Sequence, residues 1–536
     1  MADARATEIT RRLAQLKGER STLEQTWLDC YDYSFPIRGN GFFGNKDDIT
    51  TTQAKRARMF DSTATDSCRI LASGLMSGAT PSNSRWFGLS AGDDTEEEKR
   101  WFDDTAERMW ENIHASNYDA VGFECCIDIT AAGWFVMFID VDRERGGYVF
   151  QQFPISSCYL AVSKPGGTAD TLIRCYELTV EQAVNEFGIS AVSEKTAELY
   201  RQEKYDQKVQ FLHSIYPRKG GNPDALRSRN LPFAGCHIEV EGNHTVRESG
   251  YHECPFVAPR WVAVQDTAYA VGPMFDALPD VKQLNRLVYL EDTNADMAIC
   301  GAYVAEDDGV LNPRTVKIGP RMVIVANSVD SIKPLQPSGS FDLSFTKKEE
   351  LQRAIRKILM ADQLQPQDGP AMTATEVHVR VQLIRQLLGP VYGRLQAEWL
   401  QGMIERCFGL GMRAGIFMPP PPTLQNRSFR VVFISPMAKS QKLEEVSAIN
   451  NTLVAVGQLA VAKQDPSVWD LVDTDEALRE IADGQGAPAK IMRDQATVDQ
   501  IRESRAQAQQ QAAQQAQQAE MLKPATEQLA KNMVAA

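Results

Sequence analysis

Apolar residues recur every three or four positions in several long segments of the chain, a pattern that predicts amphipathic helices. The first such segment covers residues 3–29. A second ends before Pro81 and is rich in small side chains such as Gly74, which allow helices to pack closely. Two more cover residues 95–118 and 119–132, so the N-terminal part of the chain is predicted to be largely helical.

The period changes to two after Gly133, which predicts a block of β-strands. The clearest signal is a hairpin with strands at 134–142 and 148–153 around an Arg-Glu-Arg-Gly-Gly turn. Further strands are predicted at 159–162, 171–178, 209–216 and 237–241, with helices at 180–187 and 193–204. The fold class expected from these elements is α+β and mainly helical.

Two further helical patterns enclose a small β-rich insertion. They cover residues 273–299 and 344–361, and short strands are predicted between them at 301–305, 315–318 and 321–326. The chain leaves through one helix and returns through the other, so the two helices must lie near each other. The pattern predicts a helical stalk with a β tip.

A polar loop and a long kinked helix follow the stalk. Residues 362–371 contain two prolines and a glycine, which interrupt the helix. The helix restarts with Thr373 and Glu376 in capping-box spacing and continues past a kink at Gly389-Pro390 to Glu405. On periodicity alone, this pattern fits a channel or mechanical part and an ordinary helical hairpin equally well.

The C-terminal part is predicted to contain one strand and three helices. The strand lies at 429–434, and the helices lie at 439–463, at 473–482 and from 495 onward. Residues 505–520 are almost entirely Ala and Gln, which favour a helix but provide few large apolar side chains. This tail fits a helix that packs against copies of itself and a partly ordered segment equally well.

Composition narrows the class of protein. A length of 536 residues is enough for roughly two to four structural units. No apolar run reaches the roughly 18 residues of a membrane span, and the charged N-terminus lacks the apolar core of a signal peptide. We therefore expect synthesis in the cytoplasm and no membrane partner. The ten cysteines have no framework spacing and are expected to be free thiols.

The charge balance bears on nucleic acid as a partner. A net charge of −13 argues against a protein that wraps nucleic acid tightly, because that affinity comes from Lys and Arg neutralising phosphates. An acidic surface is compatible with nucleic acid that slides past, because it limits adhesion.

Three segments contain residue types that bind nucleotides or metals, but each lacks the required spacing. The glycine-rich segment 38–45 has no Gly-Lys-Ser/Thr ending and is expected to be a turn. Asp140, Asp142 and Glu144 fit a solvated hairpin rim better than a cation site, because no further ligands lie nearby in sequence. The candidate zinc ligands are Cys236, His237, His244, His252 and Cys254. The Cys-x2-Cys and His-x3-His spacings that are typical of zinc sites are absent. No hydrolase motif is present, so we expect no metal, no cofactor and no enzymatic activity.

The stalk and the loop after it carry the candidate binding residues. One face of the helix 344–361 is expected to be apolar, with Phe345, Leu351, Ile355, Ile358 and Leu359. The other face carries five basic residues, which are Lys347, Lys348, Arg353, Arg356 and Lys357. The loop contributes polar or uncharged side chains and one carboxylate, at Gln363, Gln365, Gln367, Asp368 and Met372.

The order of these elements, together with several short motifs, resembles the portal protein, or head-to-tail connector, of tailed bacteriophages. The likeness is greatest to portals of the T7-like podoviruses. The segments that carry it are 61–64, 72–75, 81–89, 268–285, 372–377 and 475–502. The resemblance covers roughly residues 1–505, and the Gln/Ala tail departs from it.

The resemblance implies a ring of about twelve subunits at one capsid vertex, with double-stranded DNA passing along the axis. It divides the chain into a wing (1–272 and 373–465), two stem helices (273–299 and 342–361), a clip (300–341), a tunnel loop (362–372) and a crown (466–536). The implied partners are the terminase large subunit and a tail adaptor at the clip, and the major capsid protein and scaffold at the wing. The protein would belong to the virion after assembly in the host cytoplasm. Two alternatives are a ring or scaffold adaptor unrelated to phages and, with less support, a metal-dependent hydrolase.

In such a ring, basic stem residues that face the axis would attract phosphates, and the polar loop would touch DNA without gripping it. Some of the basic residues must instead pair with acids of the other stem helix, such as Glu291 or Asp292. Neutralising Lys347 and Lys348 is expected to alter DNA retention or packaging while leaving the ring intact.

Overall fold

The structure is a computed structural model in which the chain forms two compact units. It describes residues 3–44, 49–92, 94–142, 146–223, 225–300, 302–305, 332–335, 341–364, 389, 391–424, 430–433, 436–463, 466–485 and 497–511. One unit comprises Met1–Ser84 with Met109–Ile416, and the other comprises Arg85–Arg108 with Phe417–Ala536. None of the helices in these described ranges is both long enough and apolar enough to cross a bilayer.

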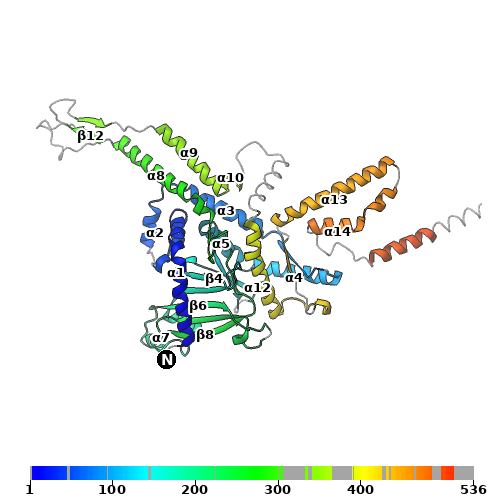
Figure 1. The fold of residues 1–536 in the computed structure, drawn as a ribbon, viewed down its shortest axis with the longest axis horizontal. Helices are drawn as coiled ribbons and strands as arrows, with labels where there is room; N and C mark the ends of the chain where they lie inside the picture. Colours follow the sequence, from blue (N-terminus) through cyan, green and yellow to red (C-terminus); the bar gives the residue numbers. More distant parts are fainter. Residues whose placement is uncertain are drawn as a thin grey trace, which may run out of the picture. The chain divides into compact units, whose positions relative to one another are not determined.

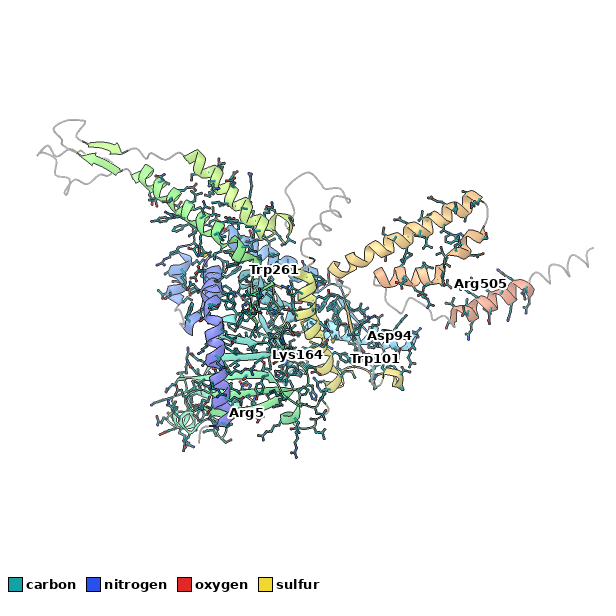
Figure 2. All side chains as sticks on the ribbon, viewed as in Figure 1. Arg5, Asp94, Trp101, Lys164, Trp261 and Arg505 are labelled. Carbon is teal, nitrogen blue, oxygen red and sulfur yellow. The ribbon has the colours of Figure 1, made fainter. Side chains whose placement is uncertain are left out.

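The first unit is built on a five-stranded antiparallel sheet in the order β4-β5-β6-β7-β8. Its strands are β4 (Cys158–Ala161), β5 (Thr171–Thr179), β6 (Lys208–Pro217), β7 (Phe233–Glu239) and β8 (His244–Tyr251). Helix α1 (Ala4–Asp32) covers one face, where its Leu13 and Leu16 share a buried core with Ile173 and Leu212 (Figure 1). Arg5 lies at the N-terminal end of α1 and forms an ion pair with Glu248 of β8 (Figure 2).

Two short helices cover part of the opposite face of this sheet. They are α6 (Val180–Phe187) and α7 (Glu194–Arg201), whose Val180 and Ala197 share a core with Phe211 of β6. The predicted N-terminal helix, the four additional strands and these two helices are therefore confirmed.

A second, smaller sheet has the order β3-β2-β9. The predicted hairpin is confirmed as β2 (Val136–Val141) paired with β3 (Tyr148–Phe153), and β9 (Phe256–Val257) joins the other edge of β2. Residues 143–145 of its turn lie outside the described residues. The other short elements of the first unit are η3 (Ile155–Ser157), η4 (Ser228–Asn230), β10 (Val262–Ala263) and β11 (Ala270–Val271).

Small side chains bring helices together at the base of the stalk. Helix α3 (Thr63–Ala79) packs against α5 (Tyr118–Ala132), and it also contacts the stalk helices described below. A Cβ atom added at Gly74 would lie 3.0 Å from a methyl group of Leu364, so glycine allows this close approach.

The glycine-rich segment 38–45 forms turns, as predicted, at η1 (Pro36–Gly39) and η2 (Phe42–Gly44). It is followed by helix α2 (Ile49–Arg56), which the pattern did not predict.

Three buried aromatic rings join α1 to the strands. The ring centroids of Trp27, Trp134 and Tyr269 lie 5.3 Å from one another. The Trp27 indole also donates a hydrogen bond to the Ala270 carbonyl at 3.0 Å. Beside them, Gly133 ends α5 with φ +92°, and a Cβ there would lie 2.1 Å from the Val271 carbonyl carbon. Only glycine fits at this crossing, immediately before the first stalk helix begins.

The long helix beyond the polar loop is anchored by a bidentate ion pair. Residues 391–395 are helical, a π-helical segment follows at Gln396–Leu400, and α12 (Gln401–Ala414) completes the helix. In the π segment, Glu398 accepts hydrogen bonds from the Arg260 guanidinium at 2.7 and 3.0 Å. The predicted capping box at 373–376 and Pro390 of the predicted kink lie outside the described residues.

Replacing Glu398 with glutamine is expected to lower the free energy of unfolding by about 2 kcal/mol, because it leaves the guanidinium of Arg260 without a carboxylate in a largely buried setting. Both side chains of the pair are about one tenth exposed. Denaturant unfolding of the variant measures the change. Glu405→Gln, further along the same helix, is the control, since Glu405 is exposed and accepts a hydrogen bond from Gln401. Equal effects of the two substitutions would contradict a stabilising role for the Arg260–Glu398 pair.

The second unit contains a two-stranded sheet and several helices. Strand β1 (Phe87–Ser90) pairs antiparallel with β14 (Arg430–Phe433), and Trp101 of α4 (Glu96–Ala115) donates a hydrogen bond to the Met418 carbonyl (Figure 2). The remaining elements are η7 (Pro422–Leu424), α13 (Pro436–Lys463), η8 (Pro466–Leu471), α14 (Thr474–Gln485) and a helix over residues 497–511.

The structure confirms the predicted strand, as β14, and the three predicted C-terminal helices, whereas β1 was not predicted. Residues 512–520 of the Gln/Ala tail lie outside the described residues, so both interpretations of the tail stay open.

Candidate nucleic-acid interface

The predicted stalk is a pair of long helices with a β ribbon beyond them. Helix α8 (Pro273–Cys300) packs beside α9 (Phe341–Ile358), and β12 (Ala302–Ala305) pairs antiparallel with β13 (Ile332–Leu335) (Figure 1). These two helices, their proximity and the first strand are confirmed. The predicted strands 315–318 and 321–326 lie outside the described residues.

The second strand of this ribbon, β13, was not predicted from the sequence. It contains Pro334, which lies opposite Tyr303. A proline fits there because alternate residues of a two-stranded ribbon point their N–H groups away from the partner strand, where no donor is needed.

Polar contacts fix the base of the helix pair to the rest of the first unit. Lys282 of α8 forms an ion pair with Asp29 of α1, with 2.5 Å between Nζ and Oδ2. The Asn285 amide bonds the Phe60 N–H at 2.7 Å and the Arg58 carbonyl at 2.9 Å. On α9, Gln352 donates to Asp61 at 2.9 Å. The stalk is therefore held at its base by contacts from both helices.

Three of the five predicted basic residues are paired with carboxylates. Lys347 and Arg353 lie 3.0 and 3.1 Å from Glu350 and Glu349 on the same helix. Lys348 reaches across to Glu291 of α8 at 3.2 Å, and Ser344 donates to the same carboxylate. The pairing with Glu291 was one of the two that the sequence suggested.

Arg356 and Lys357 differ from the other three. Both are exposed on α9, and neither makes an ion pair with any of the described residues. They lie in the last turn of α9, where positive charge also interacts favourably with the helix dipole. Of the five predicted basic residues, these two are therefore the ones that no described carboxylate neutralises.

Phe345 does not belong to the buried face as predicted, because its side chain is 61% exposed. The buried stripe consists of Leu351 and Ile355 of α9 and of Leu359 directly after the helix, each four residues from the next. At about 100° per residue, Phe345 falls about 80° from the middle of that stripe, which places it on the flank of the helix.

The chain is helical at the start of the predicted tunnel loop. Helix α9 ends at Ile358, Met360 adopts a left-handed conformation with φ +56°, and the chain forms one further helical turn, α10 (Ala361–Leu364). Gln363 is therefore helical, because burial of Ala361 and packing of Leu364 over Gly74 hold this turn in place. Gln365, Gln367, Asp368 and Met372 lie outside the described residues.

The five residues of the candidate zinc cluster do not converge. Cys236 lies in the buried core shared with α1, and the next residue, His237, points to the opposite face of the sheet. His244 and His252 bond the backbone carbonyls of Ala191 and Pro223, and the Cys254 thiol donates to the Phe256 carbonyl. The described residues contain no group of three His, Cys, Asp or Glu side chains arranged to hold a metal. Asp140 instead lies 3.8 Å from Arg406, and Glu144 lies outside the described residues.

His237 makes the stability of the sheet depend on pH. Burial, together with the nearby Arg247 and Arg174, lowers the pKa of His237 to about 4. The unfolded state therefore binds more protons at this position between pH 6.5 and pH 4, and stability is lost as the pH falls through that window. From pH 7 to pH 5 we expect a loss of about 2 kcal/mol from His237 alone.

Denaturant unfolding at both pH values tests this expectation. His237→Asn should remove about 2 kcal/mol of the pH dependence, whereas His244→Asn, at an exposed position, should leave it unchanged. An unchanged pH dependence in His237→Asn would contradict the assigned pKa direction.

Comparison with known proteins identifies the family. The family described as "Bacteriophage head to tail connecting protein" matches residues 6–492. The portal protein of Salmonella phage epsilon15 is 31% identical over 526 residues, which cover 94% of this chain and 92% of that protein. The probable portal protein of Bordetella phage BPP-1 is 28% identical over 527 residues, with the same coverage of 94% and 92%.

A solved structure, "Neck of empty GTA particle computed with C6 symmetry", is similar with a TM-score of 0.34 and 12% identity, covering 71% of this chain and 84% of that one. The identification rests on the family match and on the two phage relatives, and it confirms the resemblance seen in the sequence. The chain belongs to the bacteriophage head to tail connecting protein family.

Proposed function

We propose that this chain is the subunit of a phage portal, a ring at one capsid vertex through which double-stranded DNA enters and leaves the head and to which the tail attaches. Two relatives that match 94% of the chain are named as portal proteins of phages. The observation that carries the proposal is the α8–α9 pair, which is fixed at its base and bears exposed cations that no described carboxylate neutralises, on a protein of net charge −13.

The proposed parts follow the boundaries predicted from the sequence. Residues 273–299 and 342–361 form the stem, 300–341 the clip, 362–372 the tunnel loop, 1–272 and 373–465 the wing, and 466–536 the crown. The clip would bind the terminase during packaging and a tail adaptor afterwards, and the wing would meet the capsid protein and scaffold. This role is mechanical and requires no catalytic residue.

The division of the chain into two compact units suggests one change to the proposed boundary between wing and crown. Helix α13 packs against α14, so residues 436–463 associate with the proposed crown rather than with the wing. The same unit includes 85–108 from the N-terminal part of the chain.

The charges give the channel a physical mechanism. In a ring of about twelve copies, Arg356 and Lys357 would form two adjacent rings of positive charge in the lumen. Paired cations such as Lys347 are already neutralised by a neighbouring carboxylate, so they would add less local attraction. The acidic remainder of the surface would limit adhesion, and DNA could be held loosely while it moves.

Negative-stain electron microscopy and mass photometry of the full-length chain test the proposal. We expect closed rings of about twelve copies with a central hole wide enough for duplex DNA. Monomers or dimers, both alone and in the presence of the capsid scaffold protein, would contradict it.

A further inference from the structure

A row of four basic residues crosses the five-stranded sheet on the face opposite α1. The strand register places Arg174 of β5 opposite His213 of β6, His213 opposite His237 of β7, and His237 opposite Arg247 of β8. Arginines stand at the two ends of this row and two histidines lie between them. Protonating either histidine would place like charges opposite each other, which destabilises a sheet.

The row faces a cavity of about 480 Å³ in the first unit. Aromatic side chains from the two sheets line it, including Phe138, Phe153 and Tyr251, and α12 contributes Arg406 and Arg413. This volume lies within the range of roughly 300–1,000 Å³ that is typical of small-molecule sites.

The other arginines that line this cavity already have carboxylate partners. Arg247 lies 3.7 Å from Glu186 and also donates to the Glu186 carbonyl at 2.7 Å. Arg406 and Arg413 share Glu253, at 3.0 and 2.6 Å. Each of these cations is therefore compensated by a carboxylate within the protein.

Arg174 has no such partner. Its guanidinium is stacked over the Phe153 ring at 3.9 Å and near the Tyr176 ring at 5.1 Å, and no hydrogen bond or ion pair joins it to another described residue. Burial lowers its pKa, as expected for a cation that is removed from water without an anion beside it.

The neighbouring imidazole is also unsatisfied. His213 is 5% exposed, and its Nε2 atom is buried without a hydrogen-bond partner among the described residues. Its ring stacks on His237 with centroids 4.1 Å apart and an interplanar angle of 11°. An unpaired guanidinium and an unpaired imidazole nitrogen on adjacent strands therefore line the same cavity.

We propose that this cavity binds a phosphate-type oxyanion, free or as the phosphate group of a small organic molecule, with Arg174 as the principal ligand and His213 as a hydrogen-bond donor. A planar guanidinium binds such an anion through two parallel hydrogen bonds. A neutral imidazole supplies one more donor when its Nε2 carries the proton. Phe138 and Tyr251, which line the cavity, offer apolar surface to the organic part of a phosphate ester.

Isothermal titration calorimetry of the full-length chain with inorganic phosphate tests this site. We expect a dissociation constant on the order of 1 mM or lower. Arg174→Gln should weaken binding by about tenfold or more, because it removes the charged ligand. Arg247→Gln is the matched control in the same row, and it should change the affinity by less than about threefold because Glu186 already neutralises Arg247.

Two further titrations define the ligand. Tighter binding of a nucleoside monophosphate than of phosphate would identify a phosphate ester as the ligand, and equal binding would identify the free anion. Absence of phosphate binding, equal binding by Arg174→Gln, or acetate binding as tightly as phosphate would overturn the proposal. If Arg174→Gln fails to fold, the structure of the unsubstituted protein is determined with tungstate, an electron-dense phosphate analogue. Tungstate density beside Arg174 supports the site, and its absence there contradicts the site.

Discussion

Replacing Arg20 with methionine is expected to raise the hydrogen-exchange rates of the α1 backbone by about a thousandfold, equivalent to about 4 kcal/mol of lost local stability. Arg20 is fully buried, and its guanidinium donates to the Ser156 carbonyl at 2.8 Å and to the Cys158 carbonyl. It also lies 2.9 Å from the carboxylate of Glu24 and 4.5 Å from the centre of the Tyr159 ring. Methionine fills similar volume but leaves Glu24 without its cation and the two carbonyls without their donor.

Two variants separate the buried charge from the general effect of substitution. Arg12→Met changes an exposed arginine of the same helix. It should change the free energy of local opening that exchange measures by no more than about 0.5 kcal/mol. Arg20→Met combined with Glu24→Gln should recover part of the loss, because no uncompensated charge is left buried. Similar exchange rates in Arg20→Met and Arg12→Met would show that Arg20 does not hold α1 on the sheet.

Replacing both Arg356 and Lys357 with glutamine is expected to weaken the binding of duplex DNA to the assembled ring by about tenfold at roughly 0.1 M salt. The two side chains are the exposed cations of α9 that no described carboxylate neutralises. Their loss removes up to two phosphate contacts per subunit, so the dependence of affinity on salt concentration should also become shallower.

The control for this variant is Lys347→Gln with Arg353→Gln, which removes the same charge from cations that are paired with Glu350 and Glu349. We expect a loss of affinity of no more than about threefold for this control. DNA binding is measured as a function of salt, and mass photometry verifies that each variant still assembles. Equal losses in the two variants would show that only the total charge matters.

The structure changes the expectation for Lys348. The sequence grouped it with Lys347 as a residue whose neutralisation leaves the ring intact. Its ion pair with Glu291 links α9 to α8, so neutralising Lys348 is instead expected to loosen the stalk. Among the described residues, the carboxylate that pairs with Lys347 is Glu350 on its own helix, so Lys347 stays a candidate for the original test.

Local patterns predicted most of the elements, because helix and strand periodicity depends on neighbours along the chain. Helix α1, the β2–β3 hairpin and the α8–α9 pair all follow from the spacing of apolar residues. The errors arise where a distant contact decides the outcome. β1 forms only because β14, from the far end of the chain, pairs with it. Gln363 is helical because Leu364 packs over Gly74 of α3.

The candidate sites show the same limit. The five basic residues of α9 were visible in the sequence, but which of them are paired depends on rotamers and on the neighbouring helix. The row of Arg174, His213, His237 and Arg247 could not be predicted, because its members are scattered through four strands and meet only through the strand register. His237 was noticed as a candidate zinc ligand, but its neighbours across the strands are His213 and Arg247, and the other candidate ligands do not converge on it.

The most direct test of the account is a cryo-electron microscopy reconstruction of the assembled full-length chain. The account predicts a ring in which the α8–α9 pairs surround an open channel, with Arg356 and Lys357 of every copy directed toward its axis. A closed assembly without a channel, or a ring in which α9 faces away from the axis, would contradict the central claim that this helix guides DNA.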